Sequence, residues 1–143
     1  MAFPKPEVGL VISFAYLWSH EQQQGQTEGV RNRPCVIVTA VEEVEKQVVV
    51  TVSPITHSPP EGGDLGIEIP LRVKAHLGLD IERSWVILTE VNRFTWPGYD
   101  LRPISTQNPR IDYGFIPPAL FESIRRGILA LIHSGSRVST RRD

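Results

Sequence analysis

Short apolar runs, separated by turn residues, most constrain what this chain can fold into. Runs rich in Val, Ile and Thr alternate with segments rich in Pro, Gly, Asp and Asn, and the spacing of a long helix occurs near the C-terminus. Short strands separated by such turns are typical of small antiparallel β folds. We therefore predict a mainly β fold, a small antiparallel barrel that is closed or half-open, with a C-terminal helix packed on it. The five expected strands cover residues 8–18, 34–41, 47–53, 65–70 and 84–92.

The first of these runs has the clearest period. Its large apolar residues fall on one face, at every second position: Val8, Leu10, Ile12, Phe14 and Tyr16. Such alternation predicts a strand that is buried on one face. A polar loop of residues 19–32 follows and is long for a connection between two strands. Loops of this length are usually functional or disordered.

Residues 116–135 carry the spacing of a helix. Pro117 and Pro118 suit its first turn, and Gly135 is placed to end it. The segment 71–79 is compatible with a strand end followed by a short helix, and the residues after Gly135 are expected to fray. The apolar stripe of the predicted helix consists of Phe121, Ile124, Ile128, Leu131 and Ile132.

The length of 143 residues suits one domain, with its core over about residues 8–134 and a basic tail over residues 135–143. The formal net charge of −1 gives no global basic field, so a nucleic-acid contact would need a local patch. Of the 15 basic residues 12 are Arg, the side chain that meets phosphate with a planar fork of donors. Most of these arginines are expected to be ordinary solvated surface residues.

Several kinds of site are disfavoured. The single cysteine, Cys35, permits no internal disulfide or Cys-rich metal site, and its apolar strand predicts a buried core residue. The four histidines lack the spacing of a metal site, and no glycine-rich phosphate loop or GxSxG elbow is present, so no cofactor is expected. No apolar run approaches the roughly 18 residues of a membrane span, and no secretion signal is visible, which predicts a cytoplasmic protein without membrane contact.

Polar side chains at the ends of the predicted strands remain as candidates for function. Each has an ordinary explanation alone, such as a turn hydroxyl for Thr56 or a surface ion pair for Glu90 with Arg93. Strand ends in a small antiparallel barrel can converge on one rim, and their joint position favours a site there. The candidates are Arg33 before the second strand, Thr56 and His57 after the third, and Glu90, Asn92 and Arg93 after the fifth.

The order of these features resembles the MazF/PemK/Kid toxins of type II toxin–antitoxin systems. The segments that carry the resemblance are EVGLVISF, VRNRPCVIVTA, VVVTVSPIT, LGIEIP and VILTEVNRFTW, followed by the C-terminal helix. The resemblance covers roughly residues 8–133. It implies an SH3-like barrel that forms homodimers, cuts single-stranded RNA without a metal and is blocked by a cognate antitoxin protein. It matches the family's active-site arginine to Arg33 and its active-site threonine to Thr56.

Metal-free RNA cleavage uses the 2′-hydroxyl as the nucleophile on the adjacent phosphate, so it needs positive charge and proton transfer. Arg33 can stabilise the crowded phosphate and Thr56 can donate a hydrogen bond to it. Some family members carry an acid/base carboxylate at the position of Thr89. Here the carboxylate is one residue on, at Glu90, so either the alignment shifts by one residue or the group is missing. His57 is a second acid/base candidate.

Further residues are expected to contact the RNA. Arg31 would be an auxiliary phosphate contact, and aromatic rings could stack on unpaired bases, although core packing explains some of them equally well. The predicted RNA-binding residues are Arg31, Asn92, Arg93, Trp18 and Trp96, with Tyr16 and Phe94 as additional stacking candidates.

Two other functions stay open. An SH3-like barrel could have kept the fold and lost catalysis, and would then bind RNA or a partner peptide through the same groove. A gyrase-poisoning toxin of the same fold is a third reading, but it does not need the pair of Arg33 and Thr56.

Overall fold

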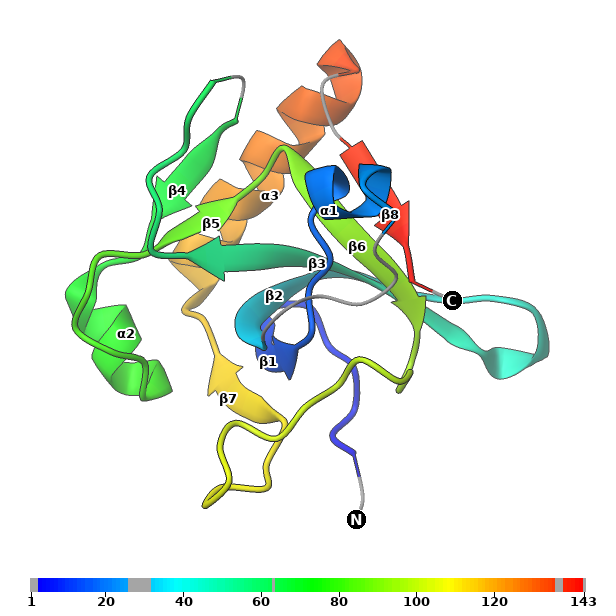
Figure 1. The fold of residues 1–143 in the computed structure, drawn as a ribbon, viewed down its shortest axis with the longest axis horizontal. Helices are drawn as coiled ribbons and strands as arrows, with labels where there is room; N and C mark the ends of the chain where they lie inside the picture. The colour runs from blue at the N-terminus through cyan, green and yellow to red at the C-terminus, as the bar shows by residue number, and fades with distance from the viewer. Residues whose placement is uncertain (1–2, 26–31, 63, 136–137, 143) are drawn as a thin grey trace.

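The computed structural model describes residues 3–25, 32–62, 64–135 and 138–142 (Figure 1). Its strands are β1 (Leu10–Phe14), β2 (Arg33–Glu42), β3 (Val48–Thr56), β4 (Gly66–Glu68), β5 (Trp85–Ile87), β6 (Glu90–Thr95), β7 (Asp112–Phe115) and β8 (Val138–Arg141). Its helices are α1 (Ser19–Gln23), α2 (Leu71–Leu77) and α3 (Pro118–Ser134), and a 3-10 turn, η1 (Val44–Lys46), joins β2 to β3. Among the described helices, none has the length and apolar character that a membrane span requires.

The strands form one strongly bent sheet in the order β4-β5-β3-β2-β1-β7, and β6 pairs with β3 and with β8. All described pairings are antiparallel except the parallel pairing of β6 with β8. The prediction of a mainly β fold with a C-terminal helix is confirmed. The prediction of a barrel is wrong in its closed form, because β4 and β7 end the path and no described pairing joins them.

Strand β3 lies at the centre of this sheet and has partner strands on both of its edges. Its first part pairs with β2 as far as the contact of Cys35 with Pro54. On its other edge β3 pairs first with β6, from Val49 to Val52, and then with β5, Ile55 opposite Val86 and Thr56 opposite Trp85. Because proline has no N–H to donate, Pro54 suits the point at which the strand leaves one partner for the other. On that edge β5 thus takes over from β6, while the start of β2 stays beside the end of β3 on the opposite edge.

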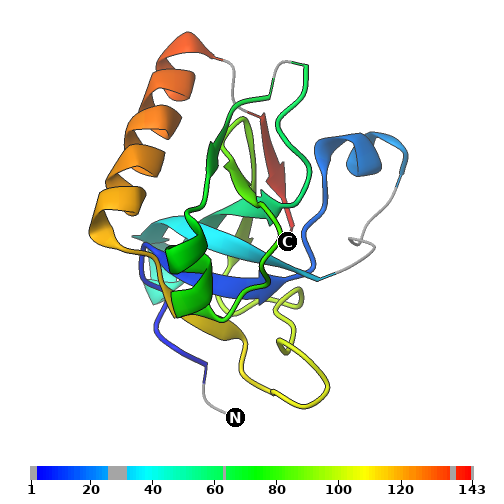
Figure 2. The ribbon, with the colours of Figure 1, turned by 90° about the vertical axis from the view of Figure 1, so that its left-hand side faces the viewer.

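The sheet is buried on both faces, which the one-sided period of residues 8–18 did not predict. All five residues of β1 are buried. On one face Val11 packs with Ile124 and Ile128 of α3, which lies along the sheet in Figure 2. On the other face Ile12 and Phe14 pack in a second core, where the Phe14 ring stacks on Phe94 with centroids 4.7 Å apart. The strand therefore belongs to two cores.

Helix α3 agrees with its predicted boundaries. Pro117 caps its start, and Gly135 ends it in the left-handed conformation with φ of 72°. Ile124, Ile128 and Leu131 are buried, whereas Ile132 is 52% exposed and falls outside the buried stripe. The segment 71–79 contains helix α2, and the predicted loop 19–32 contains the short helix α1.

The predicted strand of residues 84–92 is two strands. Leu88 N–H donates to the Leu65 carbonyl, and Thr89 Oγ1 donates to Asp64 Oδ1 at 2.8 Å, so the chain turns between β5 and β6. As a result Glu90, Asn92 and Arg93 lie within β6 and do not follow a strand. Thr56 likewise is the last residue of β3.

Two strands were not predicted. Strand β7 is short and irregular in period, and β8 lies in the tail that was expected to fray. The tail is held because β8 pairs with β6 and Arg142 forms a buried ion pair with Asp100, Nη2 to Oδ1 3.0 Å. Partner strand and counter-ion both come from distant sequence, so local pattern could not indicate them.

Core packing of α3 is testable with two variants of one helix. Ile124→Ala removes a side chain with no exposed surface from the first core, and we expect a loss of about 2–5 kcal/mol in the free energy of unfolding. Leu129→Ala, at a position 41% exposed, should cost less than about 1 kcal/mol. Urea denaturation of both variants measures the difference, and equal losses would contradict this packing.

Candidate active site

Two cavities meet at three of the predicted residues. A cavity of about 280 Å³ and a second of about 390 Å³ are both lined by Arg33, Thr56 and His57. The first extends toward Lys74 on α2 and Tyr113 on β7. The second extends toward α1 and the loop after β3, and its lining includes Trp18, Pro60, Asp64 and Glu90. The three shared residues thus occupy the middle of one groove with an arm on either side.

Strand register explains why Arg33 and Thr56 come together. Strands β2 and β3 are antiparallel with Cys35 opposite Pro54 and Val36 opposite Ser53. Continuing this register two residues further brings Arg33, at the start of β2, opposite Thr56, at the end of β3. Residues 23 positions apart in sequence therefore reach the same groove through one hairpin.

The two side chains are oriented by local contacts. The Arg33 guanidinium lies over the Trp18 ring, 5.0 Å from its centroid, which is a cation–π arrangement. Thr56 Oγ1 accepts a hydrogen bond from Ser58 N–H at 3.2 Å. Because the oxygen is the acceptor in this turn, the hydroxyl hydrogen of Thr56 can still be donated to a ligand.

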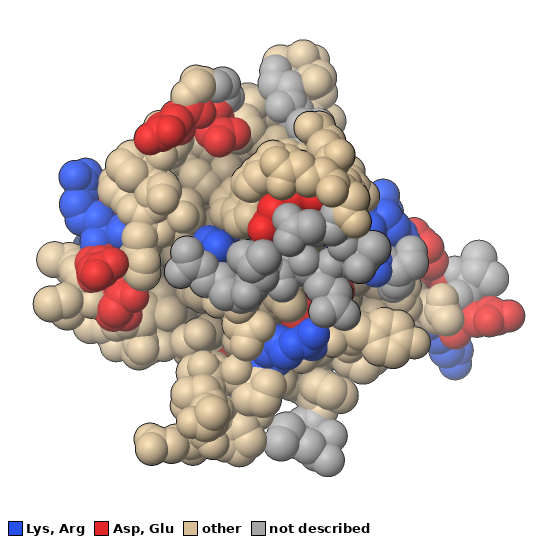
Figure 3. Space-filling model, in the orientation of Figure 1, with Lys and Arg blue, Asp and Glu red and all other residues tan. Residues whose placement is uncertain are grey.

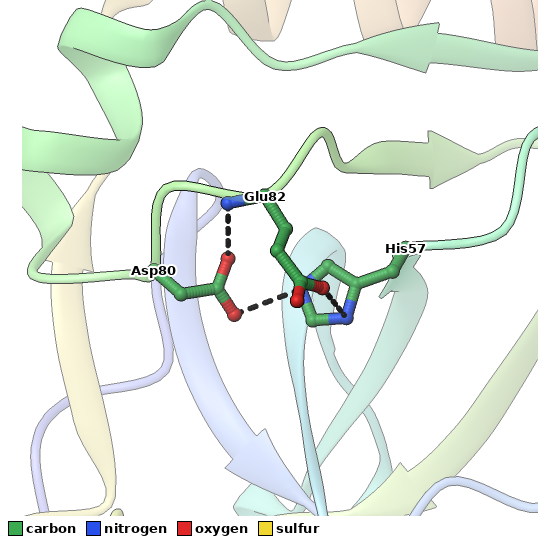
Figure 4. Close-up of side chains that lie close together, drawn as sticks. All are labelled: His57, Asp80 and Glu82. Atoms are coloured by element: carbon green, nitrogen blue, oxygen red, sulfur yellow. Dashed lines mark hydrogen bonds and ion pairs between the residues drawn. The ribbon is translucent and has the colours of Figure 1, made fainter.

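His57 lies between two carboxylates, as Figure 4 shows. Its Nε2 is 2.8 Å from Asp80 Oδ2, and its Nδ1 is 3.3 Å from Glu82 Oε2. These three side chains are the described His and carboxylate groups that lie close enough to share a metal ion. The carboxylates take opposite ring nitrogens, and Lys74 Nζ already bonds Asp80 Oδ1 at 2.7 Å. This pattern favours an ion-pair cluster over a cation site.

Glu90 is buried, 8% exposed, and lines the second cavity. Its carboxylate accepts hydrogen bonds from Tyr16 Oη, Ser19 N–H and Ser19 Oγ, each at 3.1 Å. Burial nevertheless raises the pKa of Glu90 above its ordinary value, since desolvation disfavours the charged form. The site therefore contains a carboxylate whose proton affinity is increased.

Thr89 and Glu90 have different surroundings in the structure. Glu90 lines the second cavity together with Arg33 and Thr56. Thr89 instead donates to Asp64 Oδ1 and accepts from Leu65 N–H at 3.3 Å. It thereby holds the loop that brings Asp64 to the cavity wall.

Three residues predicted to bind RNA lie elsewhere. Asn92 is fully buried, and its amide bonds the Leu17 backbone twice, accepting at 2.9 Å and donating at 2.8 Å. Arg93 lines a different cavity beside α3. Trp96 packs against the second core beside Phe94. None of the three lines either of the cavities at Arg33, Thr56 and His57, because strand β6 runs through the interior and does not end at the groove.

Of the remaining aromatic candidates for base stacking, two are buried in the core and one lines a cavity. Tyr16 and Phe94 are each about 1% exposed and belong to the second core, so they cannot stack on a base. Trp18 lines the second cavity. Arg31 lies outside the described residues.

Sequence reasoning missed the acidic and basic groups around His57. Lys74, Asp80 and Glu82 come from α2 and the turn after it, a segment whose structure the sequence left open. In the sequence, Asp80 and Glu82 are marked only as part of a group of charged residues after Leu77, and such a group more often forms a solvated surface. The described charges on the face drawn in Figure 3 are scattered, with Lys and Arg interspersed among Asp and Glu.

No protein-family model matches this chain, and no curated protein matches it significantly.

The structural role of Asn92 is testable by substitution. Asn92→Ala leaves the buried Leu17 N–H and carbonyl without their partners, and we expect a loss of roughly 2–4 kcal/mol in unfolding free energy. Asn108→Ala, on a surface turn, is the matched control and should change stability by less than about 1 kcal/mol. Denaturant unfolding is the measurement. A fully stable Asn92→Ala variant would show that these bonds do not support the fold.

Proposed function

We propose that this protein is a metal-independent endoribonuclease of the MazF/PemK/Kid type, with an SH3-like sheet, that acts as the toxin of a type II toxin–antitoxin system. The observation that carries the proposal is the meeting of Arg33, Thr56, His57 and Glu90 on one cavity. Arg33 and Thr56 are the positions that the sequence resemblance matches to the active site. Their meeting through the β2–β3 register supports that match independently of the resemblance.

The four groups can divide the reaction among them. Glu90 removes the proton of the 2′-hydroxyl, and the 2′-oxygen attacks the adjacent phosphorus. Arg33 and Thr56 donate to the phosphate oxygens as negative charge develops there. The bond from phosphorus to the 5′-oxygen breaks, and His57 gives that oxygen a proton. The products are a 2′,3′-cyclic phosphate and a 5′-hydroxyl, and no metal is needed.

The groove suits a single strand that passes over this centre. A cavity lies on either side of Arg33, Thr56 and His57, so nucleotides before and after the scissile phosphate have separate spaces. Trp18 offers a ring for base stacking, a contact worth about 1–3 kcal/mol. We extend the proposal to a cytoplasmic homodimer that a cognate antitoxin protein inhibits by covering this groove.

The bonds of Glu90 favour a second candidate function. The Glu90 carboxylate already receives three hydrogen bonds from Tyr16 and Ser19, as a purely structural carboxylate would. The protein would then be a catalytically inactive SH3-like module that binds RNA or a partner peptide in the same groove. Binding of RNA without cleavage distinguishes this function from the first.

Arg33→Ala tests the proposed catalytic centre. We expect at least a 100-fold loss, on the order of 10²–10³, in cleavage of single-stranded RNA in EDTA, because the phosphate loses its charged donors. Arg33→Lys should recover little of the rate, since an ammonium cannot form the bidentate contact. Arg110→Ala, which removes an exposed arginine paired with Asp112, is the matched control and should cut normally. Full activity of a folded Arg33→Ala variant would contradict the assignment of Arg33 as a catalytic residue.

The raised pKa of Glu90 predicts a pH dependence. A general base must be ionised, so cleavage should decline as the pH falls through the pKa of Glu90, which lies above the ordinary value of 4.5. Glu90→Gln should lower the rate by about 10²-fold or more and remove this acid limb. Asp64→Asn should move the limb to lower pH, because the Asp64 charge contributes to the raised pKa. Rate profiles between pH 4 and pH 8, with circular dichroism as the folding control, measure both effects.

A further inference from the structure

Lys74 is a charged side chain almost completely inside the protein. It projects from α2 and is 1% exposed. Its ammonium donates to Asp80 Oδ1 at 2.7 Å, to Ser84 Oγ at 2.7 Å and to the Glu82 carbonyl. Three acceptors satisfy all three N–H groups of the ammonium. A buried charge of this kind is costly unless it is paired, so the position of Asp80 is strongly determined.

Asp80 connects this buried ammonium to the groove. Oδ1 is bound by Lys74, and Oδ2 faces His57 Nε2 at 2.8 Å. The hydrogen bond from Lys74 is the largest cause that holds the pKa of Asp80 below its ordinary value, so the group remains a carboxylate. One carboxylate thus links a fixed buried cation to an imidazole that lines both cavities.

The two ring nitrogens of His57 contact different carboxylates. A carboxylate oxygen faces each ring nitrogen, and only the imidazolium has an N–H on both, because neutral imidazole has one. The contact to Glu82 is the longer, and Glu82 is 70% exposed, so Nδ1 can exchange that carboxylate for a substrate oxygen. Nε2 keeps its bond to Asp80. Other charged groups on the cavities that His57 lines are Arg33, Glu61, Asp64 and Glu90.

We propose that Lys74 and Asp80 are positioning residues that hold His57 as the general acid, with Nδ1 directed to the leaving 5′-oxygen. The step rests on the proposed ribonuclease function. As the P–O5′ bond breaks, its electron pair stays on the 5′-oxygen, and the Nδ1 proton of the imidazolium moves to that oxygen. Neutral His57 remains bonded to Asp80 through Nε2–H. Lys74 does not touch the substrate, and it acts only through Asp80.

A substrate with a better leaving group tests this assignment. Sulfur in place of the bridging 5′-oxygen leaves without protonation, so its cleavage does not require a general acid. On ordinary RNA we expect His57→Ala and Asp80→Asn to lower kcat by about 10²-fold with KM changed by less than about twofold. On the 5′-thio substrate both should come within about fivefold of the unsubstituted protein. Equal losses on both substrates would overturn the role of His57 as the acid.

Controls separate positioning from general damage. All reactions contain EDTA, which removes any contribution from a metal bound at His57, Asp80 and Glu82. Glu122→Gln removes an exposed ion-paired carboxylate on α3 and should leave both rates unchanged. Asp80→Glu keeps the carboxylate and should recover more of the ordinary RNA rate than Asp80→Asn. If Asp80→Glu is no better than Asp80→Asn, the positioning role of Asp80 is wrong.

A spectroscopic readout does not depend on cleavage. Nitrogen-15 NMR of the His57 ring should show Nε2 protonated and hydrogen-bonded in the unsubstituted protein. Both Asp80→Asn and Lys74→Met should disturb this signal, although Lys74 makes no direct contact with the ring in the described network. An unchanged signal in folded variants would overturn the network. If the unsubstituted protein cuts no RNA, the ribonuclease proposal fails while this test of the network still stands.

Discussion

The antiparallel register of β2 and β3 is the constraint on which the groove depends. It sets the start of one strand against the end of the other, so that a guanidinium and a hydroxyl meet without any loop having to hold them. A shift of one residue between the strands would leave the two side chains on opposite faces of the sheet, so that they no longer meet. Burial of both faces makes such a shift expensive. The two cores therefore preserve the geometry of the site as well as the fold.

Side-chain chemistry in the groove depends on charges that the sheet does not supply. Helix α2 and the turn after it bring a buried ammonium and two carboxylates to His57, and the loop after β3 brings Asp64 to the far cavity. The groove is therefore lined by both basic and acidic side chains and is not a uniformly basic channel. In the proposed function such a site would order a phosphate by directed donors at short range, with little contribution from a long-range field.

Local pattern was informative wherever one element carried its own signal. The prolines and Gly135 bounded α3, and Pro34 marked the start of the second strand, because capping and proline geometry act within a few residues. Arg33, Thr56 and His57 were predicted to lie together from their places at strand ends, and they line the same two cavities. Asn92 was misjudged because its neighbours look like a strand end, whereas the turn between β5 and β6 makes it an interior residue. That turn depends on the hydrogen bond from Thr89 to Asp64, a residue 25 positions earlier in the sequence.

The parallel strand β8 has a consequence for handling the protein. It covers the side of β6 that faces away from β3, and the buried pair of Arg142 with Asp100 fastens it there. Without these last residues β6 would become an open edge, with a row of unpaired N–H and carbonyl groups beside an apolar core. An open edge of this kind recruits other chains. Variants shortened at the C-terminus are therefore expected to self-associate, and an affinity tag is better placed at the opposite end of the chain.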